Sequence, residues 1–158
     1  MKEAIAREAN HLDDYDEVVA KASLNDVQLF GLEFKIKPEF YSESSKRKLG
    51  YEIDHNAIHY DPEVGLAASF ISISVTGVVG RKKVLSCKAS YSVIYDNIYQ
   101  CEESAVEAFL LRVAQFACYP YFRSLFASLD WAAGLKLPPL PVHKEAPRER
   151  KGKPAQLK

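Results

Sequence analysis

The stretch Glu102–Val142, EESAVEAFLLRVAQFACYPYFRSLFASLDWAAGLKLPPLPV, decides the fold of this chain. Between Ala105 and Ala117 only three side chains are polar, so the predicted helix is apolar most of the way around and must be covered on nearly all sides. One sheet offers one core face. We therefore expect the rest of the helix to contact other copies of the chain. The residues assigned to this oligomer interface are Val106, Leu110 and Val113.

Pro120 interrupts the helical pattern. A proline has no N–H to donate, and it pushes the preceding residue, here Tyr119, out of the helical region. The first turn of a helix tolerates proline well. The sequence therefore predicts two C-terminal helices, the first ending near Tyr119 and the second beginning at Pro120 and ending at Gly134.

The predicted second helix carries a broad apolar surface. Phe122, Phe126 and Leu129 recur at spacings that place them on one face of the helix. The apolar character continues through Leu135–Val142, where prolines prevent regular strand pairing. Two interpretations of these side chains remain open. They form ordinary core, or they line a long exposed groove of the kind that marks an interaction site.

Four segments that precede the helix carry the alternating pattern of strands. They are Leu24–Ile36, Tyr51–Ala57, Ile71–Val79 and Leu85–Tyr95. A slip of phase at Leu29-Phe30, next to Gly31, predicts a bulge in the first strand. The last two segments are predicted to form a hairpin, because only a short basic turn separates them. The fold class is α+β: a four-stranded antiparallel sheet with the two C-terminal helices packed on one face.

Phe40 and Tyr41 lie at the start of the polar stretch Glu39–Leu49. That stretch lacks periodicity and is predicted to be an exposed crossover loop. Two adjacent aromatic side chains at this place have two possible roles. They pack down as a plug, or they line a groove that binds a partner.

The chain divides into three parts. Residues 1–22 are predicted to form a short amphipathic helix with six acidic and three basic side chains. Residues 23–143 form the main domain. Residues 144–158, with six basic and two acidic side chains, are predicted to be a disordered tail that increases solubility or touches an acidic partner or nucleic acid.

Composition excludes several classes of function. Lysines and arginines balance acidic residues at 21 each, so we expect no direct binding of nucleic acid. Three cysteines, an odd number without a metal-type spacing, and charged first residues favour a cytoplasmic protein. No apolar run is long enough to cross a bilayer, so we expect no membrane insertion.

The sequence predicts no catalytic residue, no metal and no cofactor. His55 and His59 are four residues apart in a strand-like segment, which separates them by about 13 Å. Cys87 falls on the apolar side of its strand and is interpreted as core. No glycine-rich loop opens a helix, so ATP use is not indicated. An enzyme that uses His55 or His59 and a small-ligand-binding α+β domain remain as alternatives.

The segment Tyr119–Leu125, YPYFRSL, followed by Gly134 and the proline-leucine exit, resembles the end of a SecB-type chaperone. The resemblance covers about residues 24–143 and implies the SecB-like fold. Members of that family are homotetramers, arranged as dimers of dimers, that hold unfolded clients without ATP. Some deliver preproteins to the export motor SecA, and others are dedicated to antitoxins in toxin-antitoxin-chaperone modules. The basic tail and the added N-terminal helix favour the antitoxin-dedicated branch.

The resemblance also implies a client groove between the second helix, the crossover loop and nearby strand residues. The residues at these positions are Tyr51, Ile53, Phe122, Phe126, Leu129, Leu135 and Leu137. Phe40 and Tyr41 join this set if they line a groove instead of packing as a plug. The expected partner is an unfolded or partly folded protein, either an antitoxin or a preprotein.

Overall fold

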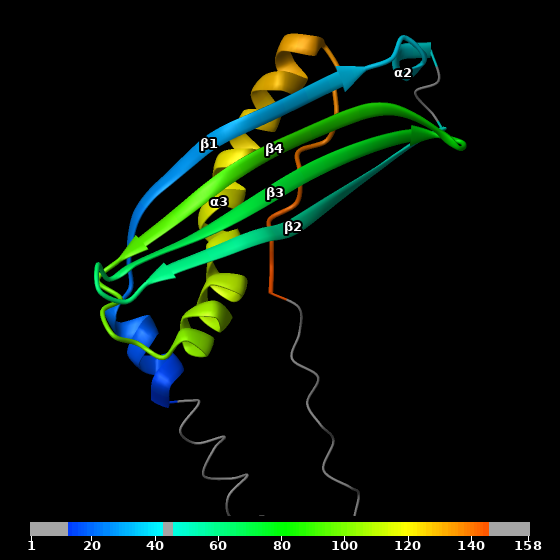
Figure 1. The fold of residues 1–158 in the computed structure, drawn as a ribbon. Coiled ribbons are helices and arrows are strands. Elements are labelled where there is room, and N and C mark those ends of the chain that lie inside the picture. The colour runs from blue at the N-terminus through cyan, green and yellow to red at the C-terminus, as the bar shows by residue number, and fades with distance from the viewer. Residues whose placement is uncertain (1–12, 43–45, 146–158) are drawn as a thin grey trace, which may run out of the picture.

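The computed structural model of the chain describes residues 13–42 and 46–145. Within these residues, four long strands form one antiparallel sheet (Figure 1). The strands are β1 (Ser23–Ile36), β2 (Arg47–Asp61), β3 (Leu66–Val79) and β4 (Lys82–Asp96), in the spatial order β1-β4-β3-β2. The short helix α2 (Glu39–Ser42) lies in the crossover from β1 to the opposite edge. The α+β class and the hairpin of the last two strands are confirmed.

The apolar face of the sheet packs against one long helix, α3 (Glu103–Ala133), which runs across it (Figure 1). Alternation produces this face: Ile71, Ile73 and Val75 of β3 are fully buried toward the helix. Their neighbours lie on the other face, where the hydroxyls of Ser72 and Ser90 are 3.1 Å apart across two strands. The core therefore lies between the sheet and α3, and the outer face of the sheet is polar.

α3 is a single helix of 31 residues with Pro120 inside it, so the prediction of two helices is wrong. A proline in a helix interior removes one hydrogen bond and costs about 3 kcal/mol. Tyr119 and Phe122 on either side are almost fully buried, and each such side chain stabilises the fold by about 1.5–3 kcal/mol. Packing against the sheet therefore outweighs the local preference of the proline.

Both ends of α3 are capped. At the start, the Glu102 carboxylate accepts a hydrogen bond of 3.0 Å from the amide of Ala105. At the end, Gly134 has φ 63°, a left-handed conformation that glycine adopts without strain. The glycine ends the helix where the sequence predicted and turns the chain back along α3.

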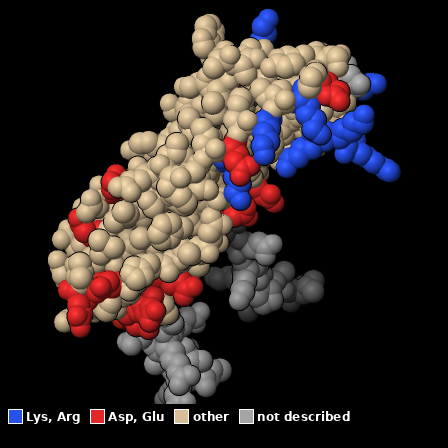
Figure 2. Space-filling model, turned by 45° about the horizontal axis from the view of Figure 1, so that its top comes forward, with Lys and Arg blue, Asp and Glu red and all other residues tan. Residues whose placement is uncertain are grey.

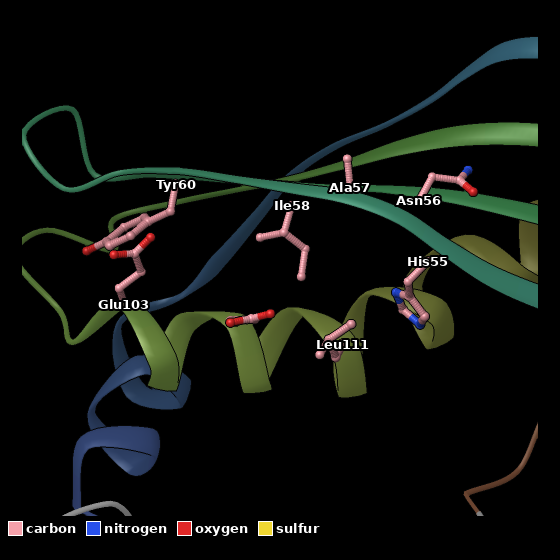
Figure 3. A pocket seen from close by; sticks show the side chains of 8 residues that line it. His55, Asn56, Ala57, Ile58, Tyr60, Glu103 and Leu111 are labelled. Carbon is pink, nitrogen blue, oxygen red and sulfur yellow. The ribbon is translucent and has the colours of Figure 1, made fainter.

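Register shifts in the edge strands set which side chains face α3. The register of β1 shifts between Leu24 and Asp26 and again between Leu29 and Gly31, and the latter shift confirms the predicted bulge. A further shift, between His55 and Ala57 of β2, was not predicted. After it, Ala57 points away from α3 and Ile58 points toward it (Figure 3). The shift reverses the inward-facing positions over the second half of β2.

Residues 13–21 are helical and dock through Val18, which is fully buried, and Tyr15, whose ring centroid lies 6.5 Å from that of Phe109. The predicted beginning of this helix lies outside the described residues, as does the basic tail beyond Glu145. None of the helices in the described part of the chain has the length and apolar character needed to span a membrane.

Charge is separated along the molecule. Figure 2 shows acidic side chains gathered at one end and most basic side chains toward the other, with side chains of both signs between them. The basic end is where β1 finishes, β2 begins and β3 turns into β4, and its residues include Lys35, Lys37, Arg47, Lys48, Arg81, Lys82 and Lys83. The acidic end is where α3 begins and β2 and β4 finish, and its residues include Asp61, Glu63, Asp96, Glu102 and Glu103.

Candidate functional site

Residues 135–145 form an extended segment, here called the strap, that returns along α3 toward its N-terminal half (Figure 1). The amide of Leu137 donates a hydrogen bond of 3.1 Å to the Asp130 carboxylate. At the other end, the Arg112 guanidinium and the Glu145 carboxylate form an ion pair of 2.7 Å. The strap therefore runs antiparallel to the helix over about 27 Å of its length.

Two side chains of α3 bind consecutive backbone carbonyls of the strap. Arg123 Nε donates to the Leu140 carbonyl at 2.8 Å, and the Tyr119 hydroxyl donates to the Pro141 carbonyl at 2.7 Å. The prolines of the strap cannot complete a strand ladder, so these carbonyls are available to side chains. Together, Tyr119 and Arg123 hold an extended backbone through groups that every peptide has.

The ring of His143 is enclosed by three aromatic rings, which we call the aromatic cage. Its centroid lies 4.8 Å from that of Phe116, 5.3 Å from Tyr119 and 6.5 Å from Tyr51. Both ring nitrogens of His143 are buried and have no hydrogen-bond partner among the described residues. Burial of a polar group without a partner is unfavourable. The cage is thus well shaped for a flat ring but poorly matched to an imidazole.

The strap does not pack tightly on α3 over its whole length. A cavity of about 410 Å³ lies between them, lined by helix residues between Pro120 and Asp130 and by Leu137–Leu140 of the strap. A smaller cavity of about 100 Å³ adjoins Phe116 and His143. Together the cavities form a discontinuous groove under the strap. It has apolar walls and a few polar groups at its edges.

The predicted client residues differ in burial. Phe122 and Phe126 are 0% and 3% exposed and stack on each other in the core, and Leu135 is buried in the same core. Phe126 and Leu137 line the larger cavity, and Tyr51 belongs to the aromatic cage. The remaining positions, Ile53 and Leu129, are half-buried against the core.

Phe40 and Tyr41 have different surroundings. Phe40 is fully buried and lies under the Arg47 guanidinium, 4.2 Å from its ring centroid. Tyr41 is 54% exposed, and its hydroxyl donates a hydrogen bond of 2.9 Å to the Ala133 carbonyl. Phe40 therefore packs as a plug, whereas Tyr41 fastens the crossover to the C-terminal end of α3.

The residues predicted for an oligomer interface lie mostly inside one chain. Val106 and Leu110 are fully buried in the core, and only Val113 keeps some exposed surface. Large exposed apolar side chains lie elsewhere: Leu29, Phe30 and Leu32 on β1, and Tyr121 and Trp131 on α3.

Trp131, 88% exposed, was not predicted as a site residue. Its position gave a signal for exposure, because it lies off the Phe122–Phe126–Leu129 stripe that faces the core.

A third cavity, of about 380 Å³ and more polar, lies between the edge strand β2 and the first half of α3 (Figure 3). His55 points into it from β2, and Glu103 and Glu107 line its helical wall. Burial lowers the pKa of His55, although the Gln115 side chain and Asp54 partly oppose the shift. No group of three or more potential metal ligands was found within residues 13–42 and 46–145.

The cysteine thiols of the core are poor nucleophiles. Cys87 and Cys118 are fully buried, as predicted for Cys87. Burial raises the pKa of Cys87 to about 11 and that of Cys118 to about 12. Both thiols therefore stay protonated near neutral pH, whereas the thiolate is the reactive form. The described site offers apolar and backbone-binding surface, and it presents no activated nucleophile with a base.

Comparison with known proteins identifies the fold. No family model and no curated protein matches the sequence. A solved structure, the Mycobacterium tuberculosis Rv1957 SecB-like chaperone in complex with a ChAD peptide from the Rv1956 HigA1 antitoxin, matches with a TM-score of 0.65 and 20% identity. The match covers 85% of this chain and 97% of that one. The chain therefore has the SecB-like fold.

A protein of unknown function from Streptococcus agalactiae matches more weakly. Its TM-score is 0.40 at 9% identity, with 78% of this chain and 97% of that one covered. A score this low supports no conclusion about fold or function.

Proposed function

We propose that this protein is an ATP-independent, SecB-like chaperone that holds an unfolded client, and that its client is an antitoxin of a toxin-antitoxin-chaperone system. The observation that supports this most directly is the likeness in fold to the Mycobacterium tuberculosis chaperone, which is bound to a peptide from an antitoxin. The protein acts by binding alone and uses no catalytic residue.

The physical basis of holding is equilibrium burial of apolar surface. Each Å² of apolar surface removed from water contributes about 25 cal/mol before the cost of ordering the client. The groove under the strap, the aromatic cage and the exposed rings of Tyr121 and Trp131 provide such surface on α3. Several weak contacts of this kind hold an unfolded chain without requiring one defined sequence.

We further propose that the protein is a cytoplasmic homo-oligomer, a tetramer built as a dimer of dimers. β1 is an edge strand with unpaired backbone groups along one side, and Leu29, Phe30 and Leu32 on it are exposed. Edge strands of this length are normally covered. Assembly would cover this edge and place several client sites in one particle, which increases avidity. The three cysteines are free, consistent with a reducing compartment.

The test combines two measurements. Multi-angle light scattering gives the mass of the particle, and light scattering from a denatured model protein shows whether aggregation is suppressed without ATP. A tetramer that suppresses aggregation supports the proposal. A monomer without holding activity contradicts it and favours a small-ligand-binding domain, since a cavity of about 410 Å³ lies within the range of ligand pockets.

The choice of client needs its own experiment. Co-expression with the antitoxin of a neighbouring gene pair should protect that antitoxin from aggregation and proteolysis. Protection of secretory preproteins together with binding to SecA would instead support the export alternative.

A further inference from the structure

We infer that residues 140–145 of the strap occupy a binding site for an extended client segment and leave it when the client binds. The site consists of Tyr119 and Arg123, which hold a backbone, and of the aromatic cage, which holds a ring. This inference rests on the proposed holding function and specifies its site. The expected ligand is an extended, proline-tolerant apolar segment that carries a flat aromatic side chain.

The contacts at this site do not depend on the identity of the strap residues. Arg123 and Tyr119 bind the carbonyl oxygens of Leu140 and Pro141, at 2.8 and 2.7 Å. Any extended peptide presents carbonyls at the same spacing, and recognition through backbone groups is a common way to bind many sequences. A client segment can therefore replace the strap without a change in the donors.

The cage selects the ring that follows these carbonyls. His143 lies two residues beyond Pro141, and its ring is packed by Phe116 and Tyr119 with centroid distances of 4.8 and 5.3 Å. Its two nitrogens are buried without partners within the described part of the chain. A phenylalanine ring would make the same ring contacts and leave no polar atom without a hydrogen bond. The strap is thus a weaker occupant than a client with an aromatic residue at this place.

The anchors of the strap also favour reversible docking. The Arg112–Glu145 ion pair is 40% and 52% exposed at its two side chains, and surface pairs of this kind hold weakly. The cavity of about 410 Å³ lies beside Leu137–Leu140, where the side chains of Leu137 and Leu140 pack against the core while Pro138 and Pro139 stay exposed. The segment therefore competes with the client while remaining easy to displace.

The experiment uses the full-length protein and a fluorescent peptide with the sequence of residues 137–145, LPPLPVHKE. His143→Asp places a carboxylate among the cage rings and should release the strap while leaving Tyr51, Phe116, Tyr119 and Arg123 intact. If the strap is docked about 90% of the time, this variant binds the peptide about tenfold more tightly than the wild type. Lys144→Asp, at the adjacent exposed position, is the matched control and should bind like the wild type.

Two further measurements identify the site. A peptide carrying His143→Phe should bind the His143→Asp protein about fivefold more tightly than the native peptide, because no unpaired nitrogen is buried. Adding Arg123→Ala to His143→Asp should weaken binding of both peptides about tenfold, because the carbonyl donor is lost. If His143→Asp fails to fold, Glu145→Arg, which removes the exposed ion pair, takes its place with an expected gain of two- to threefold.

Equal peptide binding by wild type, His143→Asp and Glu145→Arg would overturn the inference. Peptide binding by the His143→Asp protein that is unchanged after Arg123→Ala is added would also overturn it. Suppression of aggregation is measured on the same proteins. If the proteins suppress aggregation but the variants do not change peptide binding, the proposed chaperone function stands and this site is excluded. If the variants change peptide binding but no protein suppresses aggregation, the peptide site stands and the chaperone function is excluded.

Discussion

The hydroxyl of Tyr119 donates a hydrogen bond of 2.7 Å to the carbonyl of Pro141, which lies 22 residues further along the chain. The ring of Tyr119 also packs at a tilt against that of Tyr51 of β2, with ring centroids 5.7 Å apart. One side chain therefore links the long helix, an edge strand and the returning strap. Because its ring packs in the core while its hydroxyl binds the strap, removing the hydroxyl alone tests the strap contact and keeps the core packing.

Tyr119→Phe should lower the free energy of unfolding by about 1 kcal/mol, since it removes one hydrogen bond and keeps the ring. Urea denaturation followed by circular dichroism measures the change. Tyr121→Phe is the matched control, because Tyr121 is 57% exposed and its hydroxyl has no recorded partner in the described part of the chain. Equal losses in both variants would show that the Pro141 contact is not stabilising.

Pro120→Ala should raise the free energy of unfolding by about 1–3 kcal/mol. Alanine restores an N–H inside a helix that is already continuous, although the unfolded chain gains some freedom. Thermal unfolding provides the measurement. A lower melting temperature would mean that the ring of Pro120, which lines the groove under the strap, contributes more by packing than the hydrogen bond would.

Leu110→Asp should unfold the protein, because Leu110 is fully buried in the core of one chain. Burying an unpaired charge is among the most destabilising single changes. Leu111→Asp, at the adjacent position that is 41% exposed, should fold normally. A folded Leu110→Asp protein of reduced mass would instead restore Leu110 to an oligomer interface.

Trp131→Asp should keep the fold and reduce client holding about threefold or more, since an 88% exposed indole contributes little to folding but offers a large apolar surface. Phe126→Asp should unfold the protein, because Phe126 is 3% exposed and stacked on Phe122. Circular dichroism and the aggregation assay separate the two effects. Full holding by Trp131→Asp would exclude this residue from the client surface.

Stability should fall as the pH drops below about 6.5, the ordinary pKa of histidine, through the lowered pKa of His55. The unfolded chain binds the proton more readily than the folded chain, so protonation favours unfolding until both states are charged. His55→Gln should flatten this part of the pH profile. His59→Gln is the control, because His59 is exposed and lies on the opposite face of β2. Equal profiles for the two variants would contradict the assignment.

The alternation of β3 and β4 predicted the sheet correctly because their inward residues are buried without interruption from Ile71 to Val75 and from Cys87 to Val93. The bulge beside Gly31 was also predictable, since glycine marked the slip of phase. The bulge after His55 was not predictable from the sequence. Polar and apolar residues both occupy half-buried positions on this edge strand, so no clear alternation marks where the phase slips. The effect of this bulge was to place Ile58 and Tyr60, and not Ala57, on the helix side.

The continuous path of α3 through Pro120 could not be predicted from local rules. Backbone propensity describes the cost of the proline, but the compensating burial of Tyr119 and Phe122 depends on strands far away in the sequence. The exposure of the site residues could not be predicted either, because it also depends on packing between distant segments. Composition indicated a surplus of apolar side chains near the C-terminus, and helical spacing placed Trp131 off the Phe122 stripe, yet only the packing shows that the stripe is core and not an exposed groove.

The separation of charge between the two ends of the molecule has a consequence for how copies meet (Figure 2). With 21 basic and 21 acidic residues the net charge is zero, so no overall repulsion keeps copies apart, while the described part of the chain carries opposite charges at its two ends. Ends of opposite charge attract each other. End-to-end contact is heterologous and builds open chains, in competition with the closed symmetry of an oligomer. Low ionic strength should therefore favour filaments or turbidity, and salt near the physiological level should disperse them by screening.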